Sequence, residues 1–152
     1  MYTKWPINDY KKYIRKMKFK EFNSIKADFE IIEDWEDRYA YIIDLGREIP
    51  DFDTSFKSDS NKVNGCASQV WLKLSSEEKG GSQNLIFKGD SDAMIVKGLI
   101  AVIGSIYDGL PLSDIQKVNP FDKFKELDLL SHLSSQRSNG LRSIIQKIHE
   151  YN

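Results

Sequence analysis

The sequence predicts an α+β domain, with N-terminal helices, a small antiparallel sheet and then several helices packed on that sheet. Two patterns support this class. Apolar residues recur at spacings of three and four before residue 50 and after residue 93, which is typical of helices. Between Ser68 and Leu74 they occupy alternate positions, which is typical of a strand.

Two helices are expected before residue 50. The first begins near Glu21 and carries apolar residues at helical spacing: Phe22, Ile25, Phe29 and Ile32. The second begins after Asp34, which can cap it, and its core face comprises Trp35, Tyr39, Ile42, Ile43 and Leu45. Gly46 weakens the end of this helix and Pro50 lies just beyond it. Residues 51–62 follow as a long polar loop.

The middle of the chain predicts a hairpin. In the strand that begins at Ser68, the alternation places Val70, Leu72 and Leu74 on one face and Trp71 on the other. We expect Trp71 to pack against the helical layer. The polar stretch SSEEKGGSQN is expected to be a longish turn, and LIFKG a second short strand.

The C-terminal half predicts helices. Asp90 or Ser91 is expected to cap a helix that carries Asp92 in its first turn and continues to Tyr107. Because this segment is apolar on nearly every side, it should be the central core helix. Gly109 and Pro111 end it, and shorter helices follow. The closing helix directs four residues to the core: Leu141, Ile144, Ile145 and Ile148.

Composition limits the function classes. The chain has 152 residues, and we divide it into a basic appendage, residues 1–20, and one domain, residues 21–152. The appendage holds seven Lys and Arg side chains against one Asp. A nucleic-acid site would need a basic face on the folded body, so no nucleic-acid partner is expected. No apolar signal segment or bilayer-spanning stretch is visible, so we expect a soluble, cytoplasmic protein and no membrane partner.

The chain contains a single cysteine, Cys66. One thiol forms no internal disulfide and supplies too few ligands for an iron–sulfur cluster or a structural zinc site, so no metal or cofactor is expected. Cys66 follows the turn dipeptide Asn64-Gly65 and shares the parity of Val70, which places the thiol toward the apolar side.

Three interpretations of this thiol are open from the residues alone. It is a small buried hydrophobe in a binding module, a hydrolase nucleophile, or a thiol that carries a reactive adduct. A hydrolase would need His132 or His149 beside Cys66, and no local hydrolase signature surrounds any of the three.

Four collinear blocks resemble the SufE family, which includes CsdE. They are DWEDRYAYIIDLGREIP, VNGCASQVWL, GDSDAMIVKGLIAVI and LSSQRSNGL. The resemblance implies a SufE/IscU-like fold. It also implies a sulfur acceptor for a SufS-type cysteine desulfurase, a partner that uses pyridoxal phosphate. Sulfur would move onto Cys66, desulfurase turnover would rise, and the sulfur would pass to an iron–sulfur scaffold complex. A scaffold role for this chain is disfavoured because it has one cysteine.

The resemblance also implies site residues. Cys66 is the expected sulfur-accepting residue, and the expected partner-facing loop comprises Val63, Asn64, Gly65, Ala67 and Ser68. Asp92 and Arg137 lie within family blocks and are expected to line the cysteine pocket or touch the partner. Their alternative roles are a helix-dipole carboxylate and a helix-start cation. The cognate desulfurase, the final destination of the sulfur and the oligomeric state are left open.

Overall fold

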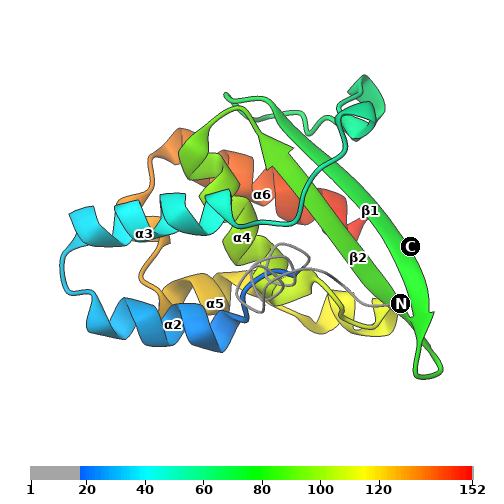
Figure 1. Cartoon of the computed structure of the whole chain (residues 1–152), viewed down its shortest axis with the longest axis horizontal. Coiled ribbons are helices and arrows are strands. Elements are labelled where there is room, and N and C mark those ends of the chain that lie inside the picture. Colours follow the sequence, from blue (N-terminus) through cyan, green and yellow to red (C-terminus); the bar gives the residue numbers. More distant parts are fainter. Residues whose placement is uncertain (1–17, 152) are drawn as a thin grey trace, which may run out of the picture.

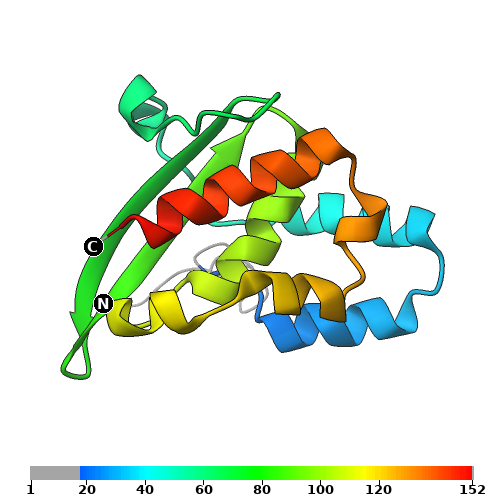
Figure 2. The same ribbon diagram turned by 180° about the vertical axis from the view of Figure 1, so that it is seen from behind.

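Helix α4, Met94–Tyr107, lies at the centre of the fold because its sequence is almost free of polar side chains. The computed structural model describes residues 18–151. Figure 1 shows α4 behind α3 and beside a long hairpin, and Figure 2 shows α6 crossing in front of α4 from the other side. Helices therefore enclose α4, and the hairpin covers the remaining side. The predicted α+β class is confirmed.

The elements follow the predicted order. They are α2 (Phe22–Ile31), α3 (Trp35–Arg47), η1 (Thr54–Phe56), η2 (Asp59–Asn61), β1 (Val70–Lys79), β2 (Ser82–Ser91), α4 (Met94–Tyr107), η3 (Leu112–Lys117), α5 (Pro120–Glu126), η4 (Leu130–His132) and α6 (Ser135–His149). Among residues 18–151, no helix combines the length and the apolar character needed to cross a membrane.

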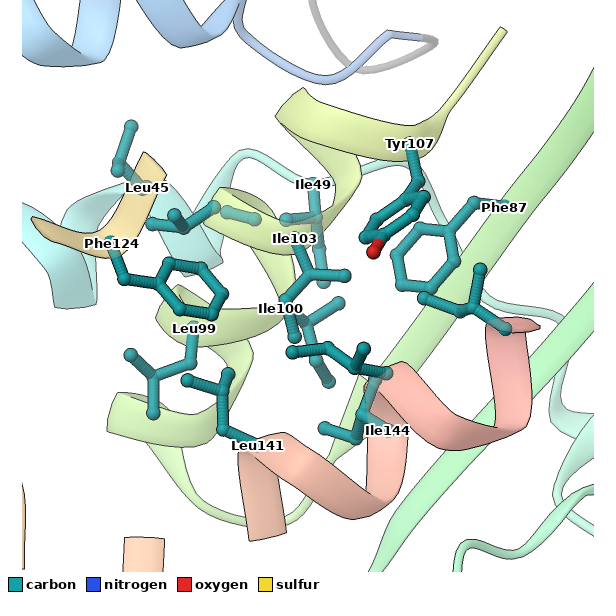
Figure 3. Packing of buried hydrophobic residues seen from close by; sticks show 14 of the residues in the cluster. Leu45, Ile49, Phe87, Leu99, Ile100, Ile103, Tyr107, Phe124, Leu141 and Ile144 are labelled. Carbon is teal, nitrogen blue, oxygen red and sulfur yellow. The ribbon is translucent and has the colours of Figure 1, made fainter. Parts of the chain in front are cut away.

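The core forms where α4 meets α6 and β2. Figure 3 shows Leu99, Ile100 and Ile103 of α4 among side chains from several elements, including Leu141 and Ile144 of α6. All four residues predicted to face the core from the closing helix are buried. Each fully buried aliphatic side chain contributes about 1.5–3 kcal/mol relative to an exposed one, so this seam is a main source of stability.

Helices α3 and α4 touch through glycines. A Cβ on Gly98 would overlap the carbonyl oxygen of Ile42, and one on Gly46 would lie 2.6 Å from the backbone nitrogen of Gly98. From the sequence, Gly46 was expected only to weaken the end of a helix. The structure instead uses it for the close approach of two helix backbones, while α3 continues to Arg47.

The junction of α2 and α3 satisfies the helix ends locally. Asp34 caps α3 as predicted, since its carboxylate accepts a hydrogen bond from the backbone N–H of Glu36. The Arg38 guanidinium donates to the carbonyl oxygens of Phe29 and Ile32, at 2.9 and 2.6 Å. These carbonyls have no partner within α2, so Arg38 stabilises the end of one helix from the next.

The hairpin differs from its prediction. Its two strands pair antiparallel from Val70↔Ser91 to Lys79↔Ser82, and only Gly80 and Gly81 form the turn. Both glycines have positive φ, 60° and 83°, which suits a tight two-residue hairpin turn. The expected longish turn was wrong because most of its polar residues are paired strand residues. Backbone pairing needs no apolar side chain, so composition concealed the strands' extent.

The outer face of the hairpin holds Trp71. Its neighbours Val70 and Leu72 are buried on the face that carries the core, so the alternation places Trp71 on the opposite side. There Lys57 lies 5.3 Å from the centre of the Trp71 ring. The prediction that Trp71 packs against the helical layer was wrong, because segment 51–62 folds across the outer face and covers it.

The N-terminal boundary of the packed domain lies before residue 21. Phe19 packs against Phe87, with ring centroids 5.5 Å apart, and Lys20 pairs with Asp28 at 2.7 Å. Residues 1–17 lie outside the described residues, so the basic appendage stays a prediction for that part of the chain.

Candidate functional site

Cys66 lies within a short loop that is closed at its base. The backbone N–H of Val63 donates to the carbonyl oxygen of Val70 at 2.8 Å, and the residues between them form the loop. Val63 is only 4% exposed, so it anchors the loop and presents no surface to a partner. The predicted partner-facing residues Asn64, Gly65 and Ala67 are exposed, and Ser68 is half-buried.

Gly65 fits the loop against α6. Its φ is +88°, a conformation that glycine adopts without strain, and this confirms the turn expected at Asn64-Gly65. A Cβ at Gly65 would also lie 2.8 Å from the Oγ of Ser143. Farther along α6, the Lys147 ammonium donates to the carbonyl oxygen of Lys62 at 3.3 Å. The segment that leads into Cys66 therefore lies along one face of α6.

The thiol of Cys66 is half-buried and points at this helix. Its S–H donates to the carbonyl oxygen of Gly140, with 3.7 Å between sulfur and oxygen. Burial raises the pKa of the Cys66 thiol above its ordinary value. A carbonyl acceptor also favours the protonated form, so the resting cysteine is a neutral thiol. The thiol thus points toward the apolar side, as predicted from the parity that Cys66 shares with Val70. The strand itself begins only at Val70, and a bend separates it from Cys66.

A cavity of about 190 Å³ adjoins the sulfur. One part of its wall is apolar and comes from α4 and α6, and another part is polar and comes from the start of α6. The lining residues are Cys66, Ala67, Ser68, Val96, Leu99, Ser134, Gln136, Arg137, Gly140, Leu141 and Ile144. Arg137 lines this cavity and also lies in the first turn of α6, so it occupies both the predicted pocket position and the alternative helix-start position, and its contact with a partner stays a prediction. The arrangement gives the thiol a partly shielded space larger than the thiol itself.

Asp92 does not line this cavity. Its carboxylate accepts a hydrogen bond from the backbone N–H of Gln69 at 3.1 Å, and its own N–H donates to the carbonyl oxygen of Gln69. Asp92 also lies outside the first turn of α4, so the expected helix-dipole position was wrong. It ties the end of the cysteine loop to the segment that enters α4.

The residue at the N-cap of α4 also differs from the prediction. Ala93 occupies this position, and no side chain caps it. Ser91 accepts a hydrogen bond from the N–H of Ala93 at 3.2 Å, and Asp90 pairs with Lys57 and Lys97. Strand β2 continues through Ser91 in register with β1. The two predicted caps, Asp90 and Ser91, are therefore strand residues, and Asp90 forms ion pairs instead of capping the helix.

Both histidines lie elsewhere. His132 stacks on Trp35, with ring centroids 3.7 Å apart, and His149 shares a hydrogen bond of 2.7 Å with the hydroxyl of Tyr107. Neither lines the cavity of Cys66. Among residues 18–151, no group of three or more His, Cys, Asp and Glu side chains is placed to hold a metal ion.

Sequence reasoning missed Gly140, which faces the thiol, and the two polar lining residues Ser134 and Gln136. Ser134 is the N-cap of α6 and accepts from the N–H of Arg137. One signal was available for Gly140, since a glycine inside a helical pattern often marks a close approach. The partner in that approach, 74 positions away, could not be read from periodicity.

Known proteins resemble this chain over most of its length. Residues 23–152 match the family model described as "SufE: Fe-S metabolism associated domain". An uncharacterized SufE-like protein of Rhizobium etli is 46% identical over 128 residues, which cover 84% of this chain and 86% of the relative. Another from Rhizobium meliloti is 45% identical over 126 residues, covering 83% and 90%.

A solved structure shares the fold. It is the solution structure of a hypothetical protein from Thermus thermophilus, with a TM-score of 0.61 over 84% of this chain and 89% of that one. The two sequences are only 16% identical, so the likeness concerns the fold alone.

Proposed function

The chain belongs to the SufE family, whose domain is associated with iron–sulfur metabolism, and from this premise we propose that it carries sulfur as a persulfide on Cys66. The donor is a SufS-type cysteine desulfurase that holds a persulfide on its own cysteine. The acceptor is an iron–sulfur scaffold complex. Pyridoxal phosphate belongs to the desulfurase, and no cofactor is assigned to this chain.

The transfer step is a thiol exchange. The Cys66 thiolate attacks the terminal sulfur of the donor persulfide, so one S–S bond forms on Cys66 as the donor S–S bond breaks. The donor cysteine leaves as a thiolate and takes up the proton that Cys66 released. Sulfur changes carrier without an external oxidant or reductant, and a single cysteine on this chain suffices.

One observation carries the proposal: the only cysteine lies in a tied loop, its sulfur beside a partly apolar cavity, without a histidine in the lining. The shielded position supports storage of a reactive adduct. The raised pKa means that Cys66 reacts slowly while the loop stays down. Docking of the desulfurase on Asn64, Gly65 and Ala67 would lift the loop, expose the thiol and raise desulfurase turnover.

Mass spectrometry tests the proposal directly. The protein is incubated with a SufS-type desulfurase and free cysteine, and the mass of the intact chain is measured before and after reductant. We expect one or more added sulfur atoms on Cys66, which reductant removes. We also expect the desulfurase to release alanine from cysteine faster than it does without this protein. The Cys66→Ser variant should fold normally and gain no sulfur.

Histidine variants separate this function from hydrolysis. His132→Ala and His149→Ala should both accept sulfur like the wild type, because neither ring lines the cavity. If either variant folds but loses sulfur acceptance, a cysteine–histidine mechanism is favoured. If the wild type gains no sulfur and gives no stimulation, a binding module with an inert cysteine is the better account. Because the thiol must remain reduced, the cytoplasm is the proposed compartment.

A further inference from the structure

Gly140 is a residue of low helix propensity in the interior of a helix. It is the sixth residue of α6, a helix of 15 residues, and its φ lies outside the region that favours glycine. Glycine destabilises a helix interior relative to alanine, because it loses more backbone freedom on folding. A glycine at this position therefore needs a reason other than the shape of the helix.

The packing of the bare thiol does not supply that reason. A Cβ on Gly140 would lie 3.4 Å from the Sγ of Cys66 and 3.9 Å from its Cβ, which are ordinary van der Waals distances. Gly98 differs sharply, since a Cβ there would overlap the backbone of Ile42. Alanine at position 140 would fit the protein whenever Cys66 carries nothing.

The space becomes limiting when Cys66 carries a second sulfur. A sulfur bonded to Sγ stands about 2.05 Å from it, so the adduct reaches well beyond the thiol. Gly140 and Cys66 both line the cavity, and the missing side chain of Gly140 widens it directly beside the Sγ. The added sulfur and an alanine methyl would compete for this volume.

We propose that Gly140 is a positioning residue whose missing side chain lets the terminal sulfur of the Cys66 persulfide lie inside the cavity. This inference rests on the proposed function and adds the determinant of adduct storage. It predicts that Gly140→Ala keeps or raises the stability of the free protein but weakens the shielding of the persulfide. The free protein becomes as stable as the wild type or more stable, while the persulfide is displaced toward solvent.

The test loads the persulfide without a protein partner. Inorganic polysulfide is the donor, since the Cys66 thiolate attacks one of its sulfurs and a shorter polysulfide anion leaves. A water-soluble trialkylphosphine then removes the terminal sulfur as the phosphine sulfide and returns the thiol. The rate of this removal, followed by intact mass, measures how well the cavity shields the adduct.

Three proteins are compared: the wild type, Gly140→Ala and the control Asn139→Ala. Asn139 is the exposed preceding residue of α6 and does not line the cavity, so its replacement raises helix propensity alone. We expect the phosphine to react roughly tenfold faster with loaded Gly140→Ala, the size expected when one methyl overfills a packed site. Asn139→Ala should match the wild type, and neither variant should melt at a lower temperature.

The outcomes distinguish the two levels of inference. If the wild type cannot be loaded by polysulfide or by desulfurase, the proposed function fails. If wild type and Gly140→Ala load and react at equal rates, only the role of Gly140 is overturned. A marked loss of thermal stability in Gly140→Ala would also overturn it, because the methyl would then conflict with the bare thiol state.

Discussion

Asp92 and Gln69 are joined by two hydrogen bonds that run in opposite directions. The N–H of Asp92 donates to the carbonyl oxygen of Gln69 at 3.3 Å, and the N–H of Gln69 donates to the Asp92 carboxylate at 3.1 Å. Only the second bond depends on the side chain. The pair lies where the cysteine loop returns to the hairpin, so a single substitution can loosen the loop without touching its residues.

Replacement of Asp92 by alanine should free the loop. The backbone N–H of Gln69 loses its acceptor, and the free energy of unfolding should fall by about 0.5–1.5 kcal/mol. Asp92→Asn keeps an oxygen acceptor and serves as the control. Urea unfolding measures stability, and the rate of Cys66 alkylation measures loop release, which should rise in Asp92→Ala. Unchanged alkylation despite lost stability would show that this bond does not restrain the thiol.

The pH dependence of Cys66 alkylation should report its burial. Only the thiolate reacts, and burial raises the pKa of Cys66 in the folded protein, so the reaction midpoint should lie at higher pH than in the urea-unfolded chain. The neutral thiol then stabilises the fold below the unfolded pKa, and this contribution is lost as pH rises through the folded pKa. A folded midpoint at or below the unfolded one would contradict the shielded, neutral resting thiol.

Gly65→Ala should destabilise the protein for two separable reasons. Alanine is strained at a φ of +88°, and its Cβ would meet the Oγ of Ser143 at 2.8 Å. We expect a loss of about 1–3 kcal/mol in the free energy of unfolding. A double-mutant cycle with Ser143→Ala should recover the steric part and leave the backbone part. If Ser143→Ala recovers nothing, the loop does not approach α6 as described.

Gly98→Ala should be severe. The added methyl would overlap the carbonyl oxygen of Ile42, so α3 and α4 must move apart, with a loss of about 3 kcal/mol or more. Gly140→Ala is the matched control, because it makes the same chemical change within a helix but meets only ordinary contacts. Chemical denaturation of both variants checks the contrast. Similar effects at the two positions would argue against the close helix crossing.

The parts of the fold that hydrophobic periodicity encodes were predictable. The stripe of Phe22, Ile25 and Phe29 indicated the first helix, and Asp34 marked the start of the second. The apolar segment ending at Tyr107 is the buried central helix, as expected. These features depend on burial and capping, which leave a local record in the sequence.

Features created by pairing were not predictable in this way. Ser75 to Lys79 resemble a polar loop, yet they form a strand because a partner strand satisfies their backbone groups. Trp71 was assigned to the wrong surroundings because no pattern in the residues near it indicates that segment 51–62 folds over it. For the same reason the sequence identified Cys66 and its turn but not Gly140, whose meaning depends on a contact between distant segments.

The few restraints on the cysteine loop set how often it opens. The bonds that hold the thiol end of the loop include two between Asp92 and Gln69 and a weak one from the thiol to Gly140. With about 1 kcal/mol net for each bond between Asp92 and Gln69 and less for the thiol bond, a loop that opens by breaking them would be a minor form, on the order of a few per cent of molecules. A partner that binds only this minor form has its apparent affinity reduced by the same fraction. Under the proposed function, these bonds would make sulfur transfer depend on a partner whose contacts favour the open form, and would disfavour reaction with thiols met by chance.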